Sequence, residues 1–438
     1  MTTVLALDVG SSSVRAQRFD ENGDPVDELR RVRSTTRDPD GHVGVVREVV
    51  AGLAEVAHAV GVSCFGQSLL ALDARGRPLT QLLGWRETRS AEAAARLRGL
   101  LDADAVRSRT GEYLHPSLWP AKLLWLAEAE PDIFREAERF VSFCDYLFER
   151  LLGVAPGCSL SIASGTGLFD LATGAWDAEL LAVLGVAEAR LPPLSETPVG
   201  TWYPAVIDGA CSNLGTGCTG RRAALMVGTS TAYRLLYETE RPEPRPGLFM
   251  YRLDEHRVVE GGALSDGGNL VRWLGHTLAR DDGNGRGAEH GLTFLPLLGG
   301  ERSTGWDPAA TGAIAGITFE TTPADIRRAA LEGVALRVAE IADRLPETTE
   351  VVATGGALLG ERGWMQIMAD ALGRPVTASG VAEGSLRGAA VSVLERLGYS
   401  VPEARLGDVF HPAQDAVEAY RSARARQRRL YEVTNGDD

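Results

Sequence analysis

The sequence predicts an α/β protein made of two similar domains. Short apolar runs that end in glycine alternate with segments whose apolar residues recur every three to four positions, as strands and helices do. One run, residues 6–13, has the same pattern as residues 224–231, about half a chain length later. A length of 438 residues with 44% hydrophobic side chains is enough for two cores. We therefore expect domains at residues 1–200 and 201–438, with the boundary in the Pro- and Gly-containing stretch 195–205.

The first half begins with strands. Residues 3–9 are mostly apolar, which predicts a buried strand. Residues 14–19 and 25–32 predict two more strands, joined by a turn-forming tetrapeptide at residues 20–23. The apolar spacing then predicts a helix at residues 43–60, a short strand at 62–65, and helices at 90–108 and 120–130.

The second half contains the strongest signal for a helix start. Thr322 suits the N-cap, Pro323 the first turn, and Asp325 the positive end of the helix dipole. The apolar face then continues until Pro346 ends the helix. The remaining predictions are a strand at residues 350–354, helices at 364–372 and 384–397, and a mobile, Gly-rich loop at 280–290.

Composition excludes several classes of protein. A net charge of −14 argues against a general nucleic-acid binder, which is expected to be basic. The five cysteines are scattered without a CxxC pair, which argues against a disulfide framework or a zinc site and fits a reducing cytosol. No apolar run approaches the length of a transmembrane helix, and the first residues do not resemble a signal peptide. Lys122 is the only lysine, so the chain has no Gly-Lys-Ser/Thr P-loop and must bind any ATP by another architecture.

The repeated run predicts two phosphate-binding turns. In each copy, an apolar strand ends in glycine and three small hydroxyl residues, so backbone N–H groups and hydroxyls converge on one point. These residues are Gly10, Ser11, Ser12 and Ser13 in the first copy, and Gly228, Thr229, Ser230 and Thr231 in the second. Asp8 in the first copy is replaced by Met226 in the second, so only the first half offers a carboxylate for Mg²⁺. The alternative is that both copies are ordinary strand–turn repeats.

Three other places have residues suited to phosphoryl transfer. Arg15 follows the first turn and can reach transition-state charge, unless it is a solvated strand residue. Asp208 leaves an apolar strand just before a glycine, where an aspartate can be a general base or only a turn-former. Gly355, Gly356 and Ala357 follow a predicted strand and either let a nucleotide lie against the backbone or simply connect that strand to a helix.

A polar and aromatic cluster in the first half is suited to a polyhydroxylated substrate. Carboxylate and amide groups pair with sugar hydroxyls, a tryptophan packs against the carbon chain, and an arginine pairs with an acid. The alternative is a surface charge cluster. The residues concerned are Gln67, Ser68, Trp85, Glu87 and Arg89.

The order of these features resembles the FGGY family of carbohydrate kinases, and within it the gluconate kinase branch. The resemblance spans nearly the whole chain and rests on residues 6–16, 68–73, 163–170, 208–213, 265–269, 295–303, 354–358, 364–375 and 384–390. It implies an actin-like, ribonuclease H-like ATPase fold in each of two domains, with ATP in the cleft between them.

The resemblance also implies a role for each matching residue. Asp8 corresponds to the Mg²⁺-linked aspartate, and Asp208 to the catalytic base that also contacts the sugar. The nucleotide residues are Gly10 to Ser13, Gly228 to Ser230, Gly312, and Gly355 to Ala357; the sugar residues are Gln67, Ser68, Trp85, Glu87 and Arg89. Two positions depart from the family pattern. Glu87 stands where members usually have aspartate, and gluconate kinases favour histidine near Gln67.

We therefore predict a cytoplasmic, Mg²⁺-dependent kinase that phosphorylates an open-chain sugar or sugar acid with ATP, gluconate being the favoured acceptor. A ketopentose (xylulose or ribulose) or a glycerol-like polyol is the alternative acceptor, and an actin- or chaperone-type ATPase without a sugar substrate is a further alternative. A non-catalytic sugar sensor is expected to lack Asp8 or Asp208, and both are present. The expected partners are the sugar and ATP, with a homodimer also considered, and neither nucleic acid nor a membrane.

Overall fold

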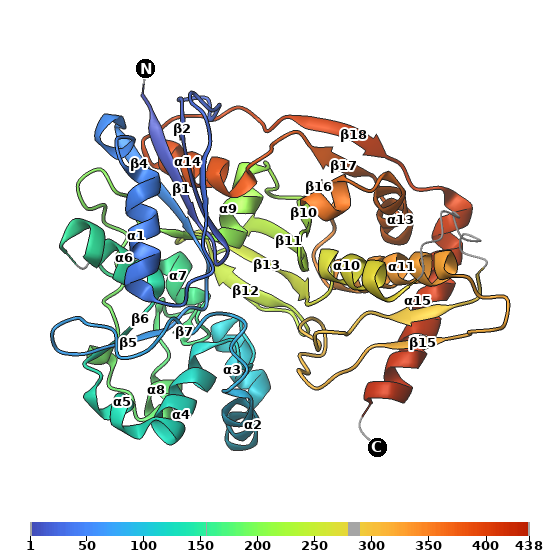
Figure 1. The fold of residues 1–438 in the computed structure, drawn as a ribbon, viewed down its shortest axis with the longest axis horizontal. Coiled ribbons are helices and arrows are strands. Elements are labelled where there is room, and N and C mark those ends of the chain that lie inside the picture. Colours follow the sequence, from blue (N-terminus) through green and yellow to red (C-terminus); the bar gives the residue numbers. More distant parts are fainter. Residues whose placement is uncertain (1, 155, 279–289, 437–438) are drawn as a thin grey trace.

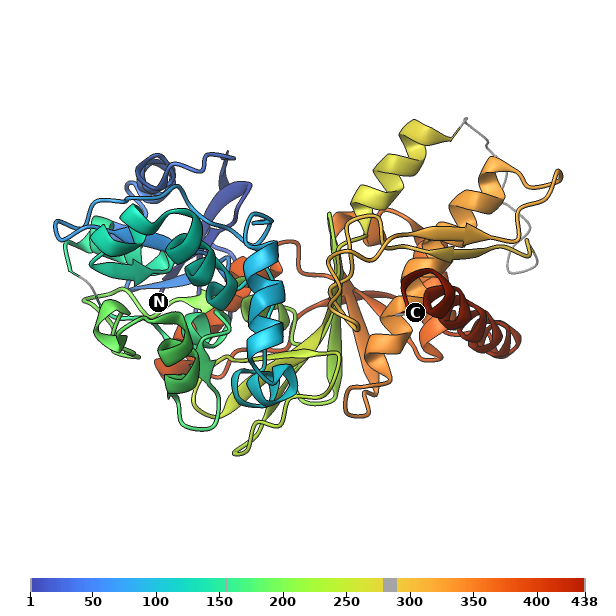
Figure 2. The ribbon, with the colours of Figure 1, turned by 90° about the horizontal axis from the view of Figure 1, so that it is seen from below.

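The computed structural model describes residues 2–154, 156–278 and 290–436. The chain forms two α/β bodies that lie side by side (Figure 1, Figure 2). Each body contains a mixed sheet covered by helices, and each has a large hydrophobic core. The predicted loop at residues 280–290 lies outside the described residues except for its last member. Among the helices of the described ranges, none is both long and apolar enough to cross a membrane.

The two sheets repeat one topology. The first has the strand order β3-β2-β1-β4-β9, and the second has the order β12-β13-β11-β10-β16-β17-β18. In each sheet an antiparallel hairpin continues into a parallel pair: β2-β1-β4 in the first and β11-β10-β16 in the second. The repeated sequence run forms the corresponding hairpins, so the sequence repeat is a structural repeat. The strands of the first sheet are β1 (Val4–Val9), β2 (Ser13–Phe19), β3 (Arg30–Arg33), β4 (Ala59–Cys64) and β9 (Val206–Ile207). Those of the second are β10 (Arg222–Val227), β11 (Thr231–Glu238), β12 (Phe249–Arg252), β13 (Arg257–Leu264), β16 (Glu350–Thr354), β17 (Val376–Ser379) and β18 (Leu406–Phe410).

Helices and short two-stranded sheets complete the bodies. The helices before the middle of the chain are α1 (Pro39–Val50), α2 (Ala91–Leu100), α3 (Ala103–Thr110), α4 (Trp119–Ala129), α5 (Pro131–Glu136), α6 (Phe143–Leu152), α7 (Leu160–Ser164), α8 (Ala178–Leu184) and α9 (Asp208–Gly215). The later ones are α10 (Gly268–Thr277), α11 (Pro323–Ala342), α12 (Gly356–Leu359), α13 (Arg362–Leu372), α14 (Gly384–Arg396) and α15 (Gln414–Asn435). The two-stranded sheets pair β5 (Leu70–Leu72) with β6 (Arg139–Val141), β7 (Phe169–Asp170) with β8 (Ala175–Trp176), and β14 (Thr293–Leu295) with β15 (Ala313–Ala315).

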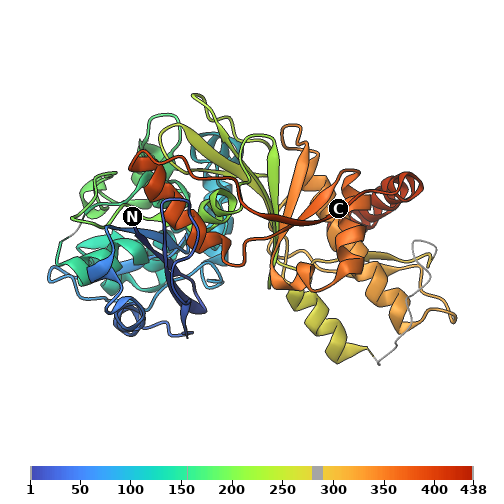
Figure 3. The same ribbon diagram turned by 90° about the horizontal axis from the view of Figure 1, so that it is seen from above.

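A late segment of the chain returns to the first sheet. Helix α14 packs against β1, β4 and α9 (Figure 3). A Cβ on Gly388 would lie 1.8 Å from the carbonyl oxygen of Cys211, so glycine is what allows α14 and α9 to approach this closely. This return places Glu383, at the N-cap of α14, beside the first predicted phosphate turn.

Most predicted elements are confirmed, including the capping of α11. The Thr322 side chain accepts from the Asp325 N–H while Asp325 accepts from the Thr322 N–H, and Pro323 occupies the first turn. The strand at residues 350–354 and the helices that end near 372 and 397 are also present.

Three boundaries were wrong. The helix predicted at residues 43–60 ends at Val50, because the chain turns at Gly52 (φ +74°) and the last residues belong to β4. The strand predicted at 25–32 is only Arg30–Arg33, since Pro25 makes a single bridge to Phe19. The helix predicted at 90–108 is two helices, because Asp102 caps a new one.

Candidate active site

The first predicted phosphate turn connects β1 to β2. The Gly10 N–H donates to the carbonyl of Ser13 at 3.0 Å, which closes the turn. Ser11 and Ser12 are exposed at its tip, and Ser13 is half-buried. The hydroxyls and N–H groups of this tip are therefore open to an anionic ligand, as a phosphate-binding turn requires.

Asp8 lies just before this turn and is 2% exposed. Its Oδ1 accepts from the Ser63 hydroxyl at 2.8 Å, and its Oδ2 forms an ion pair with Arg15 at 2.6 Å. Burial raises the pKa of Asp8 to about 6, against the opposing attraction of Arg15, and the negative charges of Asp208 and Glu383 add to the rise. Arg15 also pairs with Glu383 at 2.5 Å, so it links the first turn to the returning α14 segment.

The second predicted phosphate turn connects β10 to β11. The Gly228 N–H donates to the carbonyl of Ser230 at 3.0 Å, and Thr229 is exposed. The start of α10 lies against this turn, because the Gly268 N–H donates to the Gly228 carbonyl at 2.8 Å and the Asn269 N–H to the Thr229 carbonyl at 3.1 Å. These bonds use the carbonyl groups of the turn and hold it in place.

The predicted adenosine segment lies beside the second turn. Gly355 has φ +91°, and a Cβ on it would lie 2.3 Å from the Val227 carbonyl oxygen, so only glycine fits this approach. Gly356 is exposed, and a Cβ on it would meet nothing within 4 Å. The structure thus brings Gly228, Gly355, Gly356 and the neighbouring Ala357 to one place.

Gly312 lies in the segment before β15. A Cβ on Gly312 would meet the Leu295 carbonyl oxygen at 2.9 Å and the Leu298 side chain at 3.0 Å. Asp266, which follows β13, connects this segment to the second turn, because the Thr231 hydroxyl donates to its carbonyl and the Leu298 N–H to its carboxylate. Burial raises the pKa of Asp266 to about 7.

Asp208 is the first residue of α9 and directly follows β9. Its side chain is exposed to solvent, and its Oδ1 accepts from the Gly209 N–H at 2.8 Å. Protein nevertheless surrounds it on most sides, and this burial raises its pKa despite the attraction of Arg234, Arg302 and Arg15. A carboxylate that solvent can reach and that has a raised pKa is suited to accept a proton.

The structure adds groups to which sequence reasoning gave no role. The guanidinium of Arg302 lies 6.0 Å from the centroid of the Trp306 ring. Burial lowers the pKa of Arg302, and Glu112 opposes the shift; burial also raises the pKa of Glu112 to about 8. Trp306 stacks on Tyr113 at 4.4 Å, so this cluster joins the two bodies. In the sequence, Arg302 lies within the segment 295–303. That segment contributed only to the family resemblance and did not indicate a role for Arg302.

Glu87 and Arg89 form the centre of the predicted sugar cluster. Arg89 donates from Nε at 2.8 Å and from Nη2 at 2.7 Å to the two oxygens of Glu87, which is 8% exposed. The hydrogen bonds from Arg89 lower the pKa of Glu87 to about 2. Arg89 also lies over the Trp125 ring at 4.5 Å, whereas the half-buried Trp85 ring contacts the guanidinium of Arg86 at 4.6 Å.

Gln67 and Ser68 differ in their exposure. Gln67 is half-buried and has φ +63°, a conformation that residues other than glycine rarely adopt. Ser68 is 1% exposed, and its Oγ accepts from the Phe143 N–H at 3.0 Å. The structure therefore places Gln67 at the surface of the cluster and the Ser68 side chain beneath it.

Comparisons with known proteins identify the family of the chain. The FGGY family of carbohydrate kinases matches the chain in both parts, with its N-terminal domain over residues 3–201 and its C-terminal domain over residues 223–393. The chain belongs to this family. As an FGGY kinase it is an ATP-dependent phosphotransferase that acts on an alcohol group of a carbohydrate, with ATP as co-substrate.

Several relatives of this FGGY kinase are known. It is 26% identical to a gluconokinase from Bacillus licheniformis over 483 residues, covering 95% of this chain and 93% of the relative. It is 30% identical to a glycerol kinase from Thermus brockianus over 442 residues, covering 89% of each. The fold matches the gluconate kinase structure from Lactobacillus acidophilus, with TM-score 0.90, 24% identity, and coverage of 99% of this chain and 98% of that one. A xylulose kinase structure from the same organism matches with TM-score 0.90, 23% identity and the same coverage. The predicted two-domain, actin-like fold is thereby confirmed.

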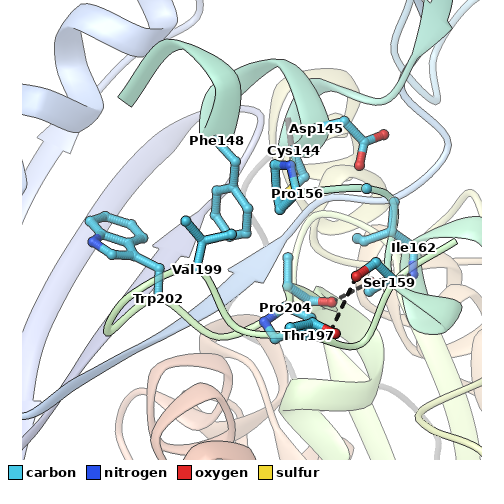
Figure 4. Close-up of a pocket in the computed structure, with 13 residues that line it drawn as sticks. Cys144, Asp145, Phe148, Pro156, Ser159, Ile162, Thr197, Val199, Trp202 and Pro204 are labelled. Carbon is cyan, nitrogen blue, oxygen red and sulfur yellow. Dashed lines mark hydrogen bonds between the residues drawn. The ribbon is translucent and has the colours of Figure 1, made fainter. Parts of the chain in front are cut away.

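One pocket of this kinase lies away from the predicted site. It has a volume of about 300 Å³ including its open mouth, and it lies between α6 and the segment that leads to β9 (Figure 4). Cys144, Phe148, Val199 and Trp202 are among its lining residues, and none of the predicted site residues lines it. Its walls combine apolar side chains of the first core with the polar residues Asp145, Ser159, Ser195 and Thr197.

Proposed function

We propose that this FGGY kinase transfers the γ-phosphate of Mg²⁺-ATP to a primary hydroxyl of an open-chain sugar acid, with gluconate as the favoured acceptor. The position of Asp208 carries this proposal. Its solvent-accessible carboxylate interacts electrostatically with Arg15 beside the first phosphate turn and with Arg302 in the other body. An acceptor hydroxyl placed there meets a base on one side and the phosphate turns on the other.

The other residues of the site serve the charge that develops on the phosphoryl group. In the proposed reaction Asp208 takes the proton of the acceptor hydroxyl as its oxygen attacks the γ-phosphorus in line. The N–H groups and hydroxyls of the two turns, together with Arg15, bind the phosphoryl oxygens. Closure of the two bodies around the substrates would exclude water, so that transfer is favoured over hydrolysis.

The donor set around the first turn fits Mg²⁺. This ion is commonly held by one or two carboxylates together with phosphate oxygens and water, and Asp8 offers a buried carboxylate beside the turn, whose Oδ2 is paired with Arg15 at 2.6 Å. When bound, Mg²⁺ neutralises charge on the phosphate groups. We place the reaction in the cytosol, where ATP is available and thiols such as the five buried cysteines stay reduced.

The choice of gluconate rests on two supports. Gluconokinases from two Bacillus species are similar to the chain over at least 95% of its length. In addition, Arg302 and Arg234 bring positive charge close to Asp208, which suits an acidic acceptor. A glycerol-like polyol is the second candidate, because glycerol kinases are up to 30% identical to the chain, and a ketopentose is the third.

The test measures ADP release from Mg²⁺-ATP with gluconate, other sugar acids, xylulose, ribulose, glycerol and no acceptor. A clear preference for gluconate supports the proposal. A preference for glycerol or a ketopentose retains the phosphoryl transfer and replaces the acceptor. Equal release without any acceptor would refute phosphoryl transfer to a sugar and would indicate an ATPase.

A further inference from the structure

The chain's only lysine lies beneath the predicted sugar cluster. Lys122, on α4, is fully buried, and its Nζ donates to the carbonyl oxygen of Gln67 and, at 3.2 Å, to that of Leu83. Gln67 belongs to one predicted sugar-binding segment, and Leu83 comes two residues before Trp85 in the other. Hydrogen bonds from the single ammonium group of Lys122 therefore connect the two segments.

Helix α4 holds the first of these segments by two adjacent carbonyl groups. Trp119, one helical turn before Lys122, donates from Nε1 to the carbonyl of Ser68 at 2.8 Å. The spacing of three residues puts the Trp119 and Lys122 donors on one face of the helix. The two donors of α4 thus hold the consecutive carbonyl groups of Gln67 and Ser68. Gln67 is also the residue whose backbone has φ +63°.

Burial of an ammonium group costs free energy, because the charged group loses its hydration. Here burial lowers the pKa of Lys122 to about 7, and the negative charge of Glu87 opposes this shift. Glu87 lies in the second segment. Lys122 therefore makes hydrogen bonds to both segments and an electrostatic interaction with the second. An apolar side chain could fill the same volume, but it could not hold two carbonyl groups.

We propose that Lys122 is a positioning residue for the acceptor site. It holds Gln67 in its left-handed conformation and fixes the Gln67 segment relative to the segment of Trp85 and Glu87. It does not touch the acceptor itself, since its side chain is buried beneath both segments. This inference rests on the proposed function, because it assumes that these two segments bind the acceptor.

Kinetics of two variants test the proposal. Lys122→Met keeps the length of the side chain and removes the donors, and we expect the KM for the acceptor to rise about tenfold or more while the KM for ATP changes less than twofold. Trp119→Phe removes the neighbouring donor and should shift the acceptor KM in the same direction. Glu128→Gln, on the solvent side of the same helix, is the matched control and should leave both constants unchanged. An acceptor KM within twofold of the parent in both folded variants would overturn the proposal.

A spectroscopic measurement on the unmutated protein covers the case in which Lys122→Met does not fold. Protein grown on ¹³Cε-lysine carries one labelled side chain, so its NMR spectrum contains one lysine signal. We expect this signal to shift when the acceptor is added and to stay in place when ADP alone is added. A signal that ignores the acceptor, or responds only to ADP, would refute the proposal.

The two proposals can fail separately. Both experiments use whichever acceptor the ADP-release panel selects. If glycerol or a ketopentose is that acceptor and its KM rises in Lys122→Met, the gluconate assignment is wrong and the positioning role is supported. If gluconate is the acceptor and its KM is unaffected, the positioning role is wrong and the gluconate assignment stands.

Discussion

Asp8 and Arg15 are directly opposite each other on β1 and β2, and their side chains form an ion pair of 2.6 Å at the base of the first phosphate turn. The antiparallel register produces this pairing, because the turn between them begins immediately after Val9. The same hairpin in the second body has Met226 in place of Asp8, so it lacks the carboxylate. The charge that the proposed chemistry needs is therefore confined to one of two similar hairpins.

Ionisation of Asp8, together with that of the proposed base Asp208, should set the acid limb of the activity. The pKa of the Asp8 carboxyl is raised to about 6 by burial, so the ionised form that binds a cation is lost as the pH falls through about 6. Mg²⁺ competes with the proton for this carboxylate, and we expect higher Mg²⁺ concentrations to move the acid limb of kcat/KM to lower pH.

Asp8→Asn should lower kcat by about 10²-fold or more and abolish the Mg²⁺ response. Glu383→Gln changes the other partner of Arg15 and should retain that response; an acid limb that ignores Mg²⁺ in the parent enzyme would contradict the assignment.

Replacing Asp208 by asparagine should separate catalysis from binding. The amide has nearly the same volume but cannot accept a proton from the acceptor hydroxyl, so we expect kcat to fall on the order of 10²- to 10⁴-fold. The affinity for ATP, measured by calorimetry, should change little because the phosphate turns are untouched. Asp104→Asn removes a carboxylate that is 88% exposed on α3 and serves as the control. Near-normal turnover of Asp208→Asn would show that another group is the base.

Local sequence patterns predicted the hairpins and their turns well. A strand, a glycine and small hydroxyl residues are specified within eight consecutive positions, and the capping residues of α11 within four. The same local view failed at residues 43–60, where apolar residues of β4 continued the spacing of α1 without a break in the pattern.

Contacts between distant segments could not be predicted from such patterns. The pairing of Arg15 with Glu383 depends on the return of α14 to the first sheet, and nothing near either residue signals it. The stacking of Trp306 on Tyr113 likewise joins the two bodies. Burial of Ser68 was missed for a related reason, since its partner Phe143 belongs to a separate helix.

The ion pair between Glu87 and Arg89 should affect the acceptor and not the nucleotide. Glu87→Gln removes one oxygen of a two-bond interaction and the negative charge that Arg89 requires, so we expect the acceptor KM to rise on the order of tenfold with little change in the KM for ATP. Because the hydrogen bonds from Arg89 lower the pKa of Glu87 to about 2, this carboxylate remains ionised down to pH about 4 and should not contribute to the acid limb. Glu92→Gln, an exposed change on α2, is the control. An equal rise in both KM values would indicate a general disturbance of the fold.

Substitutions at two adjacent glycines should distinguish an effect on nucleotide binding from an effect on stability. Gly355 has φ +91° and ψ 132°, and its Cα lies so close to the Val227 carbonyl that a Cβ would be 2.3 Å from the oxygen. Gly355→Ala should therefore lower the melting temperature by several degrees, since the backbone strain alone is worth about 1–3 kcal/mol, and should also raise the KM for ATP. A Cβ on Gly356 meets no protein atom within 4 Å, so Gly356→Ala should leave the melting temperature unchanged. If adenosine lies against this segment, the added methyl group occupies its space, and the KM for ATP rises while the acceptor KM does not. An unchanged KM for ATP in a stable Gly356→Ala variant would place the adenosine elsewhere.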